Sequence, residues 1–233
     1  MLGVNYADDG ILSYRSASQI NQAMGRVYGY MGLAVVISML VSMGIGTNPE
    51  LVTFFFTGVM HWVVMLAPLL AVFLLVPFLN ANPPKELALL ALGGFSALMG
   101  LSFSVIFAVY TAMSIFNAFM GAAVLFGTMS FYGYFTKKDL SSMGQMMFVG
   151  LIAIIIASII NIFIGSTVMQ MVISAIAIII FLGLTAYDTQ QIREMIMDAD
   201  ATGAQEVSGA LTLYLDFINI FLSLLQLFGD KKE

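Results

Sequence analysis

Hydrophobic and polar residues of this chain fall into long blocks. Charged residues are absent from positions 27–49, 51–84, 87–136 and 140–187. A helix that crosses a bilayer needs about 20 apolar residues, because it rises about 1.5 Å per residue. The 23-residue block fits one such helix, and the blocks of 50 and 48 residues fit two each. The pattern therefore predicts a polytopic helical membrane protein.

The 34-residue block at 51–84 is long for one spanning helix and short for two. Pro68 and Pro77 lie inside it, so we assign one helix kinked at Pro68, preceded by an interfacial lead-in at 51–57. A last apolar stretch is interrupted only by Asp216. The predicted spans are seven in number, at about 27–46, 59–79, 87–109, 112–135, 146–164, 168–188 and 208–228.

These spans divide the chain into three parts. They are a polar cytoplasmic N-terminal arm at 1–26, a seven-helix transmembrane domain at 27–229 and a short charged tail at 230–233. The fold class is therefore an all-α membrane protein, in contact with the lipid bilayer.

Composition excludes several classes of protein. Hydrophobic residues make up 61% of the chain and charged residues 9%, whereas a soluble domain carries about 25% charged residues. The chain has no cysteine and one histidine, which excludes disulfides, thiolate metal sites and multi-histidine metal sites. It has no basic run for nucleic acid, no phosphate loop and no nucleophile motif. We therefore expect neither an enzyme nor a resident cofactor.

The distribution of lysine and arginine predicts the orientation. Six of them lie before the first span or in alternate connections, and the connections on the other side carry none: Arg15, Arg26, Lys85, Lys137, Lys138 and Arg193. Because positive loops stay in the cytoplasm, the N-terminus should be cytoplasmic. Seven spans then place Lys231 and Lys232 on the other side, unless the last segment does not fully cross.

Small residues recur at helical spacing in two places. Gly25 and Gly29 form a GxxxG motif, and a stripe of small residues follows one face of the segment at 87–109. The stripe contains Gly93, Ala97, Gly100, Ser104 and Ala108. Close helix packing is the plain interpretation, and a hinge or pore lining is the alternative.

Asp216 is the one charged residue in the last apolar stretch. A carboxylate in a membrane segment costs about 2.5–3.5 kcal/mol, so such residues are candidates for function. One helical face carries a polar stripe made of Gly209, Thr212, Asp216, Asn219, Ser223 and Gln226. This face would line an ion pathway through Thr212, Asn219 and Ser223, or it would act only as polar glue between helices.

Asp188 closes the segment at 168–188, after Thr185 on the same face, where the helix dipole disfavours an anion. A short loop joins this segment to the last one, so Asp188 and Asp216 could meet. Two carboxylates in a poorly solvated site would share a proton at mildly acidic pH, and once ionised would offer hard oxygens to Ca²⁺. Alternatively, Asp188 is an ordinary helix-end residue, or Arg193 neutralises either aspartate. Asn161 is a third polar group in a span, either a cation ligand or helix glue.

Three segments resemble the Bax inhibitor-1 family, also called the transmembrane Bax inhibitor motif family. They are Gly-Leu-Thr-Ala-Tyr-Asp-Thr-Gln at 183–190, Leu-Thr-Leu-Tyr-Leu-Asp-Phe-Ile-Asn-Ile-Phe at 211–221, and Phe-Tyr-Gly-Tyr-Phe-Thr-Lys-Lys-Asp-Leu at 131–140. The last of these looks like bacterial inner-membrane members.

The resemblance implies a seven-helix fold with the last helix central in the bundle. It also implies a pH-sensitive calcium leak, in which two aspartates at the positions of Asp188 and Asp216 share a proton and sense pH. Some bacterial members carry basic residues near the end of the second helix that can latch onto these aspartates. Here the stretch at 76–84 has nothing basic before Lys85, so this chain departs from the family pattern on which gating by that route depends.

The resemblance also supplies a rival function. One bacterial relative restrains a membrane-bound ATP-dependent protease, which would make this chain a regulatory partner without ion flux that uses its polar arm as the contact. A proton-coupled transporter is a third interpretation, but the sequence has no inverted repeat to favour it.

Overall fold

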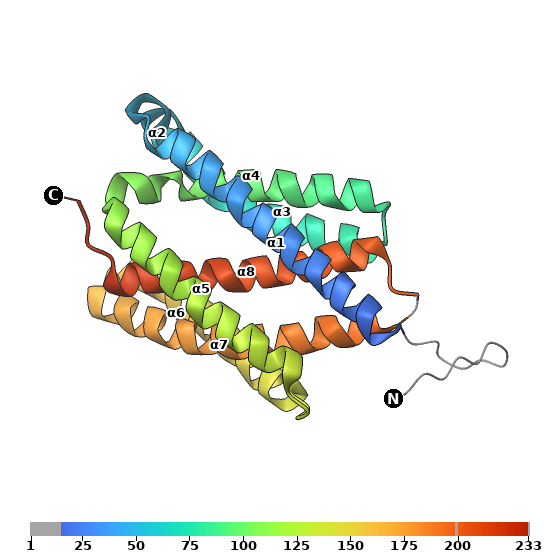
Figure 1. Cartoon of the computed structure of the whole chain (residues 1–233). Coiled ribbons are helices and arrows are strands. Elements are labelled where there is room, and N and C mark those ends of the chain that lie inside the picture. The colour runs from blue at the N-terminus through green and yellow to red at the C-terminus, as the bar shows by residue number, and fades with distance from the viewer. Residues whose placement is uncertain (1–14, 199, 233) are drawn as a thin grey trace. The chain divides into compact units, whose positions relative to one another are not determined.

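The computed structural model of the chain describes residues 15–198 and 200–232 (Figure 1). This part of the chain folds into eight helices: α1 Ala17–Gly46, α2 Pro49–Phe56, α3 Gly58–Asn80, α4 Lys85–Val109, α5 Ala112–Phe135, α6 Ser141–Ile164, α7 Thr167–Met197 and α8 Gly203–Phe228. All except α2 are long and apolar enough to cross a membrane. The all-α class and the seven predicted spans are confirmed.

Several helices extend beyond the predicted spans. Helix α1 begins at Ala17, ten residues before the predicted start at 27. A capping box explains the early start, because Ser16 Oγ accepts from the Gln19 N–H and Gln19 Oε1 accepts from the Ser16 N–H at 2.8 Å. An apolar block marks the part of a helix suited to a membrane, and the helix itself continues as long as its backbone is satisfied. Residues 1–14 of the predicted arm lie outside the described residues.

The block at 51–84 contains one long helix and one short one. The predicted lead-in is α2, whose first N–H groups donate to the Asn48 side chain at 3.0 and 3.3 Å. Gly58 makes the turn into α3 with a φ of +60°, a conformation that glycine adopts without strain. Pro68 and Pro77 both lie within α3, as predicted for a single span.

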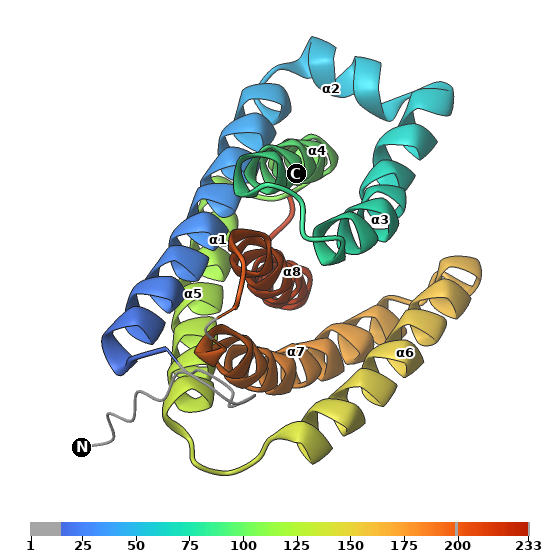
Figure 2. The same ribbon diagram turned by 90° about the vertical axis from the view of Figure 1, so that its right-hand side faces the viewer.

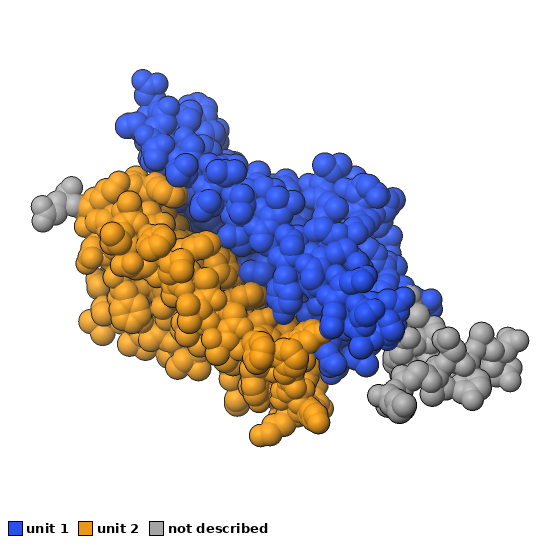
Figure 3. Space-filling model, in the orientation of Figure 1, with its two compact units in different colours: residues 1–105, 191–214 blue, residues 106–190, 215–233 orange. Residues whose placement is uncertain are grey.

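The chain forms two compact units, which are coloured separately in Figure 3. Unit 1 comprises residues 1–105 and 191–214, and unit 2 comprises residues 106–190 and 215–233. Helices α4, α7 and α8 contribute to both units.

In unit 1, the first half of α8 packs against α1 and α4. Tyr214 is fully buried, and its hydroxyl lies 2.7 Å from Ser38 Oγ of α1. Glycine is needed at position 100, where α4 approaches α1, because a Cβ there would lie 2.6 Å from the Ser38 carbonyl oxygen. Close packing along the small-residue stripe is therefore confirmed at Gly100. Close packing is wrong for the separate GxxxG motif, because an added Cβ at Gly25 or Gly29 would meet no atom within 4 Å.

In unit 2, α5 and α6 approach α7 at glycines, and α6 lies alongside α7 (Figure 2). A Cβ at Gly133 of α5 would collide with the backbone of Ala186, and one at Gly144 of α6 would lie 2.5 Å from the Tyr187 ring. The second half of α8 packs on α5 through Phe217, in edge contact with two phenylalanine rings. These contacts fix the part of α7 and α8 that carries the predicted site.

The tail after α8 also belongs to unit 2 and pairs with the connection between α4 and α5. The Thr111 N–H donates to the Asp230 carbonyl at 3.1 Å, and the Lys232 N–H donates to the Val109 carbonyl at 2.8 Å. Lys232 Nζ donates to the Phe107 carbonyl at 2.7 Å. Helix α8 is long and apolar enough to cross a membrane, and its C-terminal end lies beside the connection between α4 and α5.

Helix α8 is the most enclosed of the seven long helices. Of its most apolar stretch, 56% is buried, against 33% or less for the others. A helix that carries a polar stripe needs such enclosure, because lipid cannot satisfy polar groups. The burial agrees with the expectation that the last helix is central.

Candidate functional site

The structure brings Asp188 of α7 and Asp216 of α8 together within unit 2. Their carboxyl groups lie within hydrogen-bonding reach of each other. The Asp216 side chain is buried, with 4% of its surface exposed, and Asp188 is half-buried. The two carboxyl groups therefore form a contact pair in a poorly solvated place.

The prediction that Asp188 closes its helix is wrong. Helix α7 continues for nine residues, to Met197, so the helix dipole does not act on Asp188 as we expected. The extension is polar but contains no glycine or proline to end the helix. Gln190 anchors it, because its side chain accepts from the Leu140 N–H at 2.9 Å and donates to the Lys138 carbonyl at 2.8 Å. These nine residues, 189–197, thus belong to a helix rather than to a loop.

One oxygen of the pair has no donor. Asp216 Oδ2 is buried and has no hydrogen-bond partner among the described residues. The Thr185 hydroxyl lies within hydrogen-bonding reach of Asp216, but it donates its own proton to the Phe181 carbonyl at 2.7 Å. A buried carboxylate oxygen without a donor is energetically costly, and binding a proton or a cation removes that cost.

The donor set suits a hard cation. Carboxylate and hydroxyl oxygens are the ligands that Ca²⁺ prefers. No group of three or more His, Cys, Asp or Glu side chains gathers in the described part of the chain. A cation held by Asp188 and Asp216 would therefore complete its shell with hydroxyl, carbonyl or water oxygens.

The residues predicted to line a pathway lie along α8 on both sides of Asp216. The Thr212 hydroxyl donates to the Ser208 carbonyl at 3.2 Å, and Asn219 Nδ2 donates to the Leu215 carbonyl at 2.8 Å. These bonds remain within α8, whereas polar glue requires bonds to other helices. Ser223 is buried at 7% exposure. A pathway-lining role for Thr212, Asn219 and Ser223 stays a prediction.

The far end of the stripe does bond to neighbouring helices. Gln226 Oε1 accepts from Gln170 Nε2 at 2.8 Å and from Ser174 Oγ at 2.9 Å, both on α7. Asn161 Nδ2 of α6 donates to Gln170 Oε1 at 3.2 Å, and Asn161 Oδ1 accepts from the Ser166 N–H at 3.2 Å. We call Asn161, Gln170, Ser174 and Gln226 the amide cluster. Asn161 thus links two helices, as its interpretation as glue predicts.

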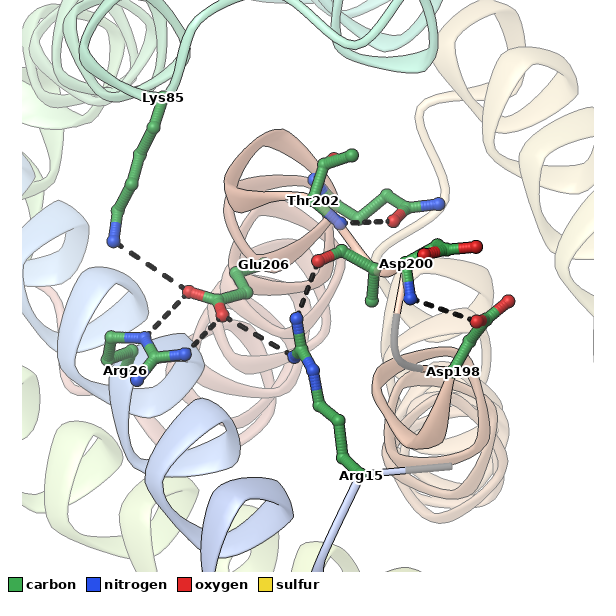
Figure 4. Close-up of polar contacts among 9 residues, drawn as sticks. Arg15, Arg26, Lys85, Asp198, Asp200, Thr202 and Glu206 are labelled. Carbon is green, nitrogen blue, oxygen red and sulfur yellow. Dashed lines mark hydrogen bonds and ion pairs between the residues drawn. The ribbon is translucent and has the colours of Figure 1, made fainter. Parts of the chain in front are cut away.

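A second polar site, in unit 1, was missed by the sequence reasoning. Glu206, in the first turn of α8, is buried at 3% exposure and is surrounded by three cations (Figure 4). Arg26 binds both carboxylate oxygens, with Nε at 2.8 Å from Oε2. Arg15 Nη1 and Lys85 Nζ each lie 3.9 Å from the carboxylate. We call these four residues the Glu206 cluster.

Arg15 also holds the chain in place just before α1 begins. Its Nη2 donates to the Ala201 carbonyl at 2.6 Å, and its backbone N–H donates to the Met197 carbonyl at 2.9 Å. The segment before α1 is thereby tied to the connection between α7 and α8. The sequence did contain a clue, because Glu206 lies two residues before the last predicted span and Arg15, Arg26 and Lys85 lie on the same predicted side of the membrane.

Two ionisable groups outside the spans have altered pKa values. Hydrogen bonds from Ser141 lower the pKa of the Asp139 carboxyl, in the connection between α5 and α6. Burial raises the pKa of the Tyr110 hydroxyl, beside the C-terminal tail. Both residues lie in connections between helices, and both are distant in sequence from Asp188 and Asp216.

The chain has known relatives over almost its whole length. A family model described as "Inhibitor of apoptosis-promoting Bax1" matches residues 20–233. The inner membrane protein YbhL of Escherichia coli K12 is 37% identical over 229 residues, which cover 96% of this chain and 97% of the relative. An uncharacterized protein of Rickettsia prowazekii is 36% identical over 92% of each chain. An uncharacterized membrane protein of Streptococcus pyogenes serotype M1 is also 36% identical, over 95% of this chain and 98% of the relative.

Proposed function

The chain belongs to the Bax inhibitor-1 family, and on that premise we propose that it is a pH-sensitive, calcium-permeable leak channel of the bacterial inner membrane. The observation that carries the proposal is the contact between the carboxyl groups of Asp188 and Asp216, with one buried oxygen that has no donor. The pair is the proton sensor and the cation site.

The pair can hold either a proton or a cation. A hydrogen bond between two carboxyl groups requires a proton on one of them, because an ionised carboxylate only accepts. When the proton leaves, two negative charges face each other at short range and attract a divalent cation. Proton and Ca²⁺ therefore compete for the same oxygens, and Ca²⁺ affinity falls as the pH falls.

The route for the ion follows the polar stripe of α8. Asn219, Ser223 and Gln226 lie beyond Asp216 toward the C-terminal end of this helix, and Thr212 lies one turn before it. Such a stripe offers hydroxyl and amide oxygens in steps of about one helical turn. These side chains replace part of the water that an ion loses on entering the membrane.

Localisation and orientation rest on two supports. YbhL is named as an inner membrane protein. The six lysine and arginine residues on one side of the predicted topology favour a cytoplasmic N-terminus. The Asp188–Asp216 pair then lies toward the cytoplasmic half, and the amide cluster lies toward the outer surface.

The second candidate is a regulatory partner of a membrane-bound protease. The observation that favours it is that Arg15, within the predicted arm, is anchored by hydrogen bonds to the Ala201 and Met197 carbonyls. Deleting residues 1–14 would abolish regulation and spare ion flux if the arm is the contact. Regulation that survived the deletion would rule out the arm as the contact.

The proposed function is tested by Ca²⁺ flux into proteoliposomes. We expect a wild-type flux that changes between roughly pH 6 and pH 8, and a response that is flattened in Asp188→Asn and Asp216→Asn. Asp230→Asn is the matched control, because it removes an exposed carboxyl of the tail. The absence of flux above empty liposomes at every pH would contradict the channel and favour the regulatory partner.

A further inference from the structure

The amide cluster, in unit 2, lies at the C-terminal end of the polar stripe of α8. Asn161 lies three residues before the end of α6, Gln170 in the first turn of α7, and Gln226 two residues before the end of α8. Three helices thus meet at the same end, joined by hydrogen bonds of 2.8 to 3.2 Å. The connection from α6 to α7 carries no lysine or arginine.

Every amide oxygen of the cluster is occupied. Gln226 Oε1 accepts two hydrogen bonds, while Gln170 Oε1 and Asn161 Oδ1 accept one each. In this arrangement the oxygens face protein donors. Breaking the two hydrogen bonds of Gln170 would release its own Oε1 and leave Gln226 Oε1 with Ser174 as its donor, so two neutral, hard oxygens of the kind that bind Ca²⁺ would become accessible.

The cluster marks a boundary in exposure along the stripe. Gln226 is exposed, whereas Ser223, one turn earlier on the same face, is buried at 7% exposure. Ten residues separate Gln226 from Asp216, so the cluster lies about 15 Å along the helix from the carboxyl pair. Hydrogen bonds that only hold helices together do not require Gln226 to lie at the point where the stripe changes from exposed to buried.

We propose that the amide cluster is the outer gate of the pathway along α8, and that its amide oxygens are the first protein ligands that an entering cation meets. This inference rests on the proposed function, because a gate requires a pathway. The cluster holds no ionisable group, so it provides ligands at every pH, while the aspartate pair supplies the pH response.

The absence of cysteine from the chain permits a direct test. Ser223→Cys places a single thiol behind the gate, and a charged, membrane-impermeant thiol reagent is added from the outer side of vesicles. We expect slow labelling in an otherwise wild-type chain and labelling that is at least several-fold faster when Gln170→Ala opens the cluster. Ca²⁺ in the medium should slow the faster reaction, and Na⁺ at equal ionic strength should not.

Two controls separate a gate from general loosening. Gln145→Ala removes an exposed glutamine at the opposite end of α6 and should leave the labelling of Ser223→Cys unchanged. Leu222→Cys places the thiol beside the stripe and should stay slow with Gln170→Ala. Equal acceleration at Leu222→Cys and Ser223→Cys would overturn the gate, because it would mean that the helices had separated.

The readout does not depend on ion flux. If Gln170→Ala leaves the labelling of Ser223→Cys unchanged while wild-type protein conducts Ca²⁺, the gate is wrong and the channel stands. If labelling accelerates as expected but no variant conducts, the cluster closes a water-filled cavity and the channel is wrong.

Discussion

At the scale of single residues, Asp216 is buried with an oxygen that has no donor. Removing an ionised carboxylate from water costs several kcal/mol unless a proton, a cation or a partner compensates. Asp188 can provide that compensation only if the two carboxyl groups hold a proton or a cation between them. The two residues should therefore behave as one functional unit.

The first prediction follows from this coupling. Asp188→Asn and Asp216→Asn should each remove most of the pH response of Ca²⁺ flux, and the double variant should be little worse than either single variant. The measurement is the flux at acidic and alkaline pH in the four proteins of the cycle. Losses that simply add would mean that the two carboxyl groups act separately.

A second prediction concerns Glu206. Glu206→Gln leaves the positive charges of Arg15, Arg26 and Lys85 without their shared carboxylate, and should lower the free energy of unfolding by about 1–3 kcal/mol, because Arg26 and Lys85 remain partly exposed to solvent. Thermal unfolding in detergent measures the effect. Glu86→Gln, which removes an exposed acid from the first turn of α4, serves as the control and should change little. Equal melting temperatures for the two variants would count against a stabilising cluster.

At the scale of helices, the position of Asp188 depends on how closely α5 approaches α7. Gly133 packs against the backbone of Ala186, two residues from Asp188, and Ser130 Oγ lies 3.0 Å from Thr189 Oγ1. Both contacts come from the same face of α5. This helix therefore holds α7 in the place that lets Asp188 reach Asp216.

The third prediction tests that support. Gly133→Ala places a methyl group against the Ala186 carbonyl, so α5 must shift, at a cost of about 1–3 kcal/mol. We expect lower stability and a weakened pH response of flux. Gly127→Ala, on the same helix, meets no atom within 4 Å and should be neutral or slightly stabilising. An unchanged pH response in a destabilised Gly133→Ala protein would show that the approach of α5 does not position the pair.

The hydropathy pattern predicted the middle part of each helix better than the residues at which the helix begins and ends. The segment at 17–26 is polar, but the cap at Ser16 starts α1 there. The residues after Asp188 are also polar, and Gln190 holds them in α7 through the connection between α5 and α6. In both cases a hydrogen bond to a cap or to a distant segment decided the end of the helix, and such bonds leave no hydrophobic pattern.

At the scale of the whole molecule, the absence of charge from long blocks was sufficient to predict seven spans and an all-helical fold. The same counting explains why Asp216 was found, since a lone acid in an apolar block is conspicuous. Glu206 was not, because it lies among other polar residues near the start of α8. Its partners come from positions 15, 26 and 85, and only the fold of unit 1 brings them together.

The central claim is that a proton and Ca²⁺ compete for the oxygens of Asp188 and Asp216. The measurement that tests it most directly is proton release on addition of Ca²⁺ to the detergent-solubilised protein in weakly buffered solution. We predict release of about half a proton per bound Ca²⁺ at the midpoint of the pH response, rising toward about one at lower pH, and none from the double variant Asp188→Asn, Asp216→Asn. Ca²⁺ binding without proton release, or equal release from the double variant, would contradict the account.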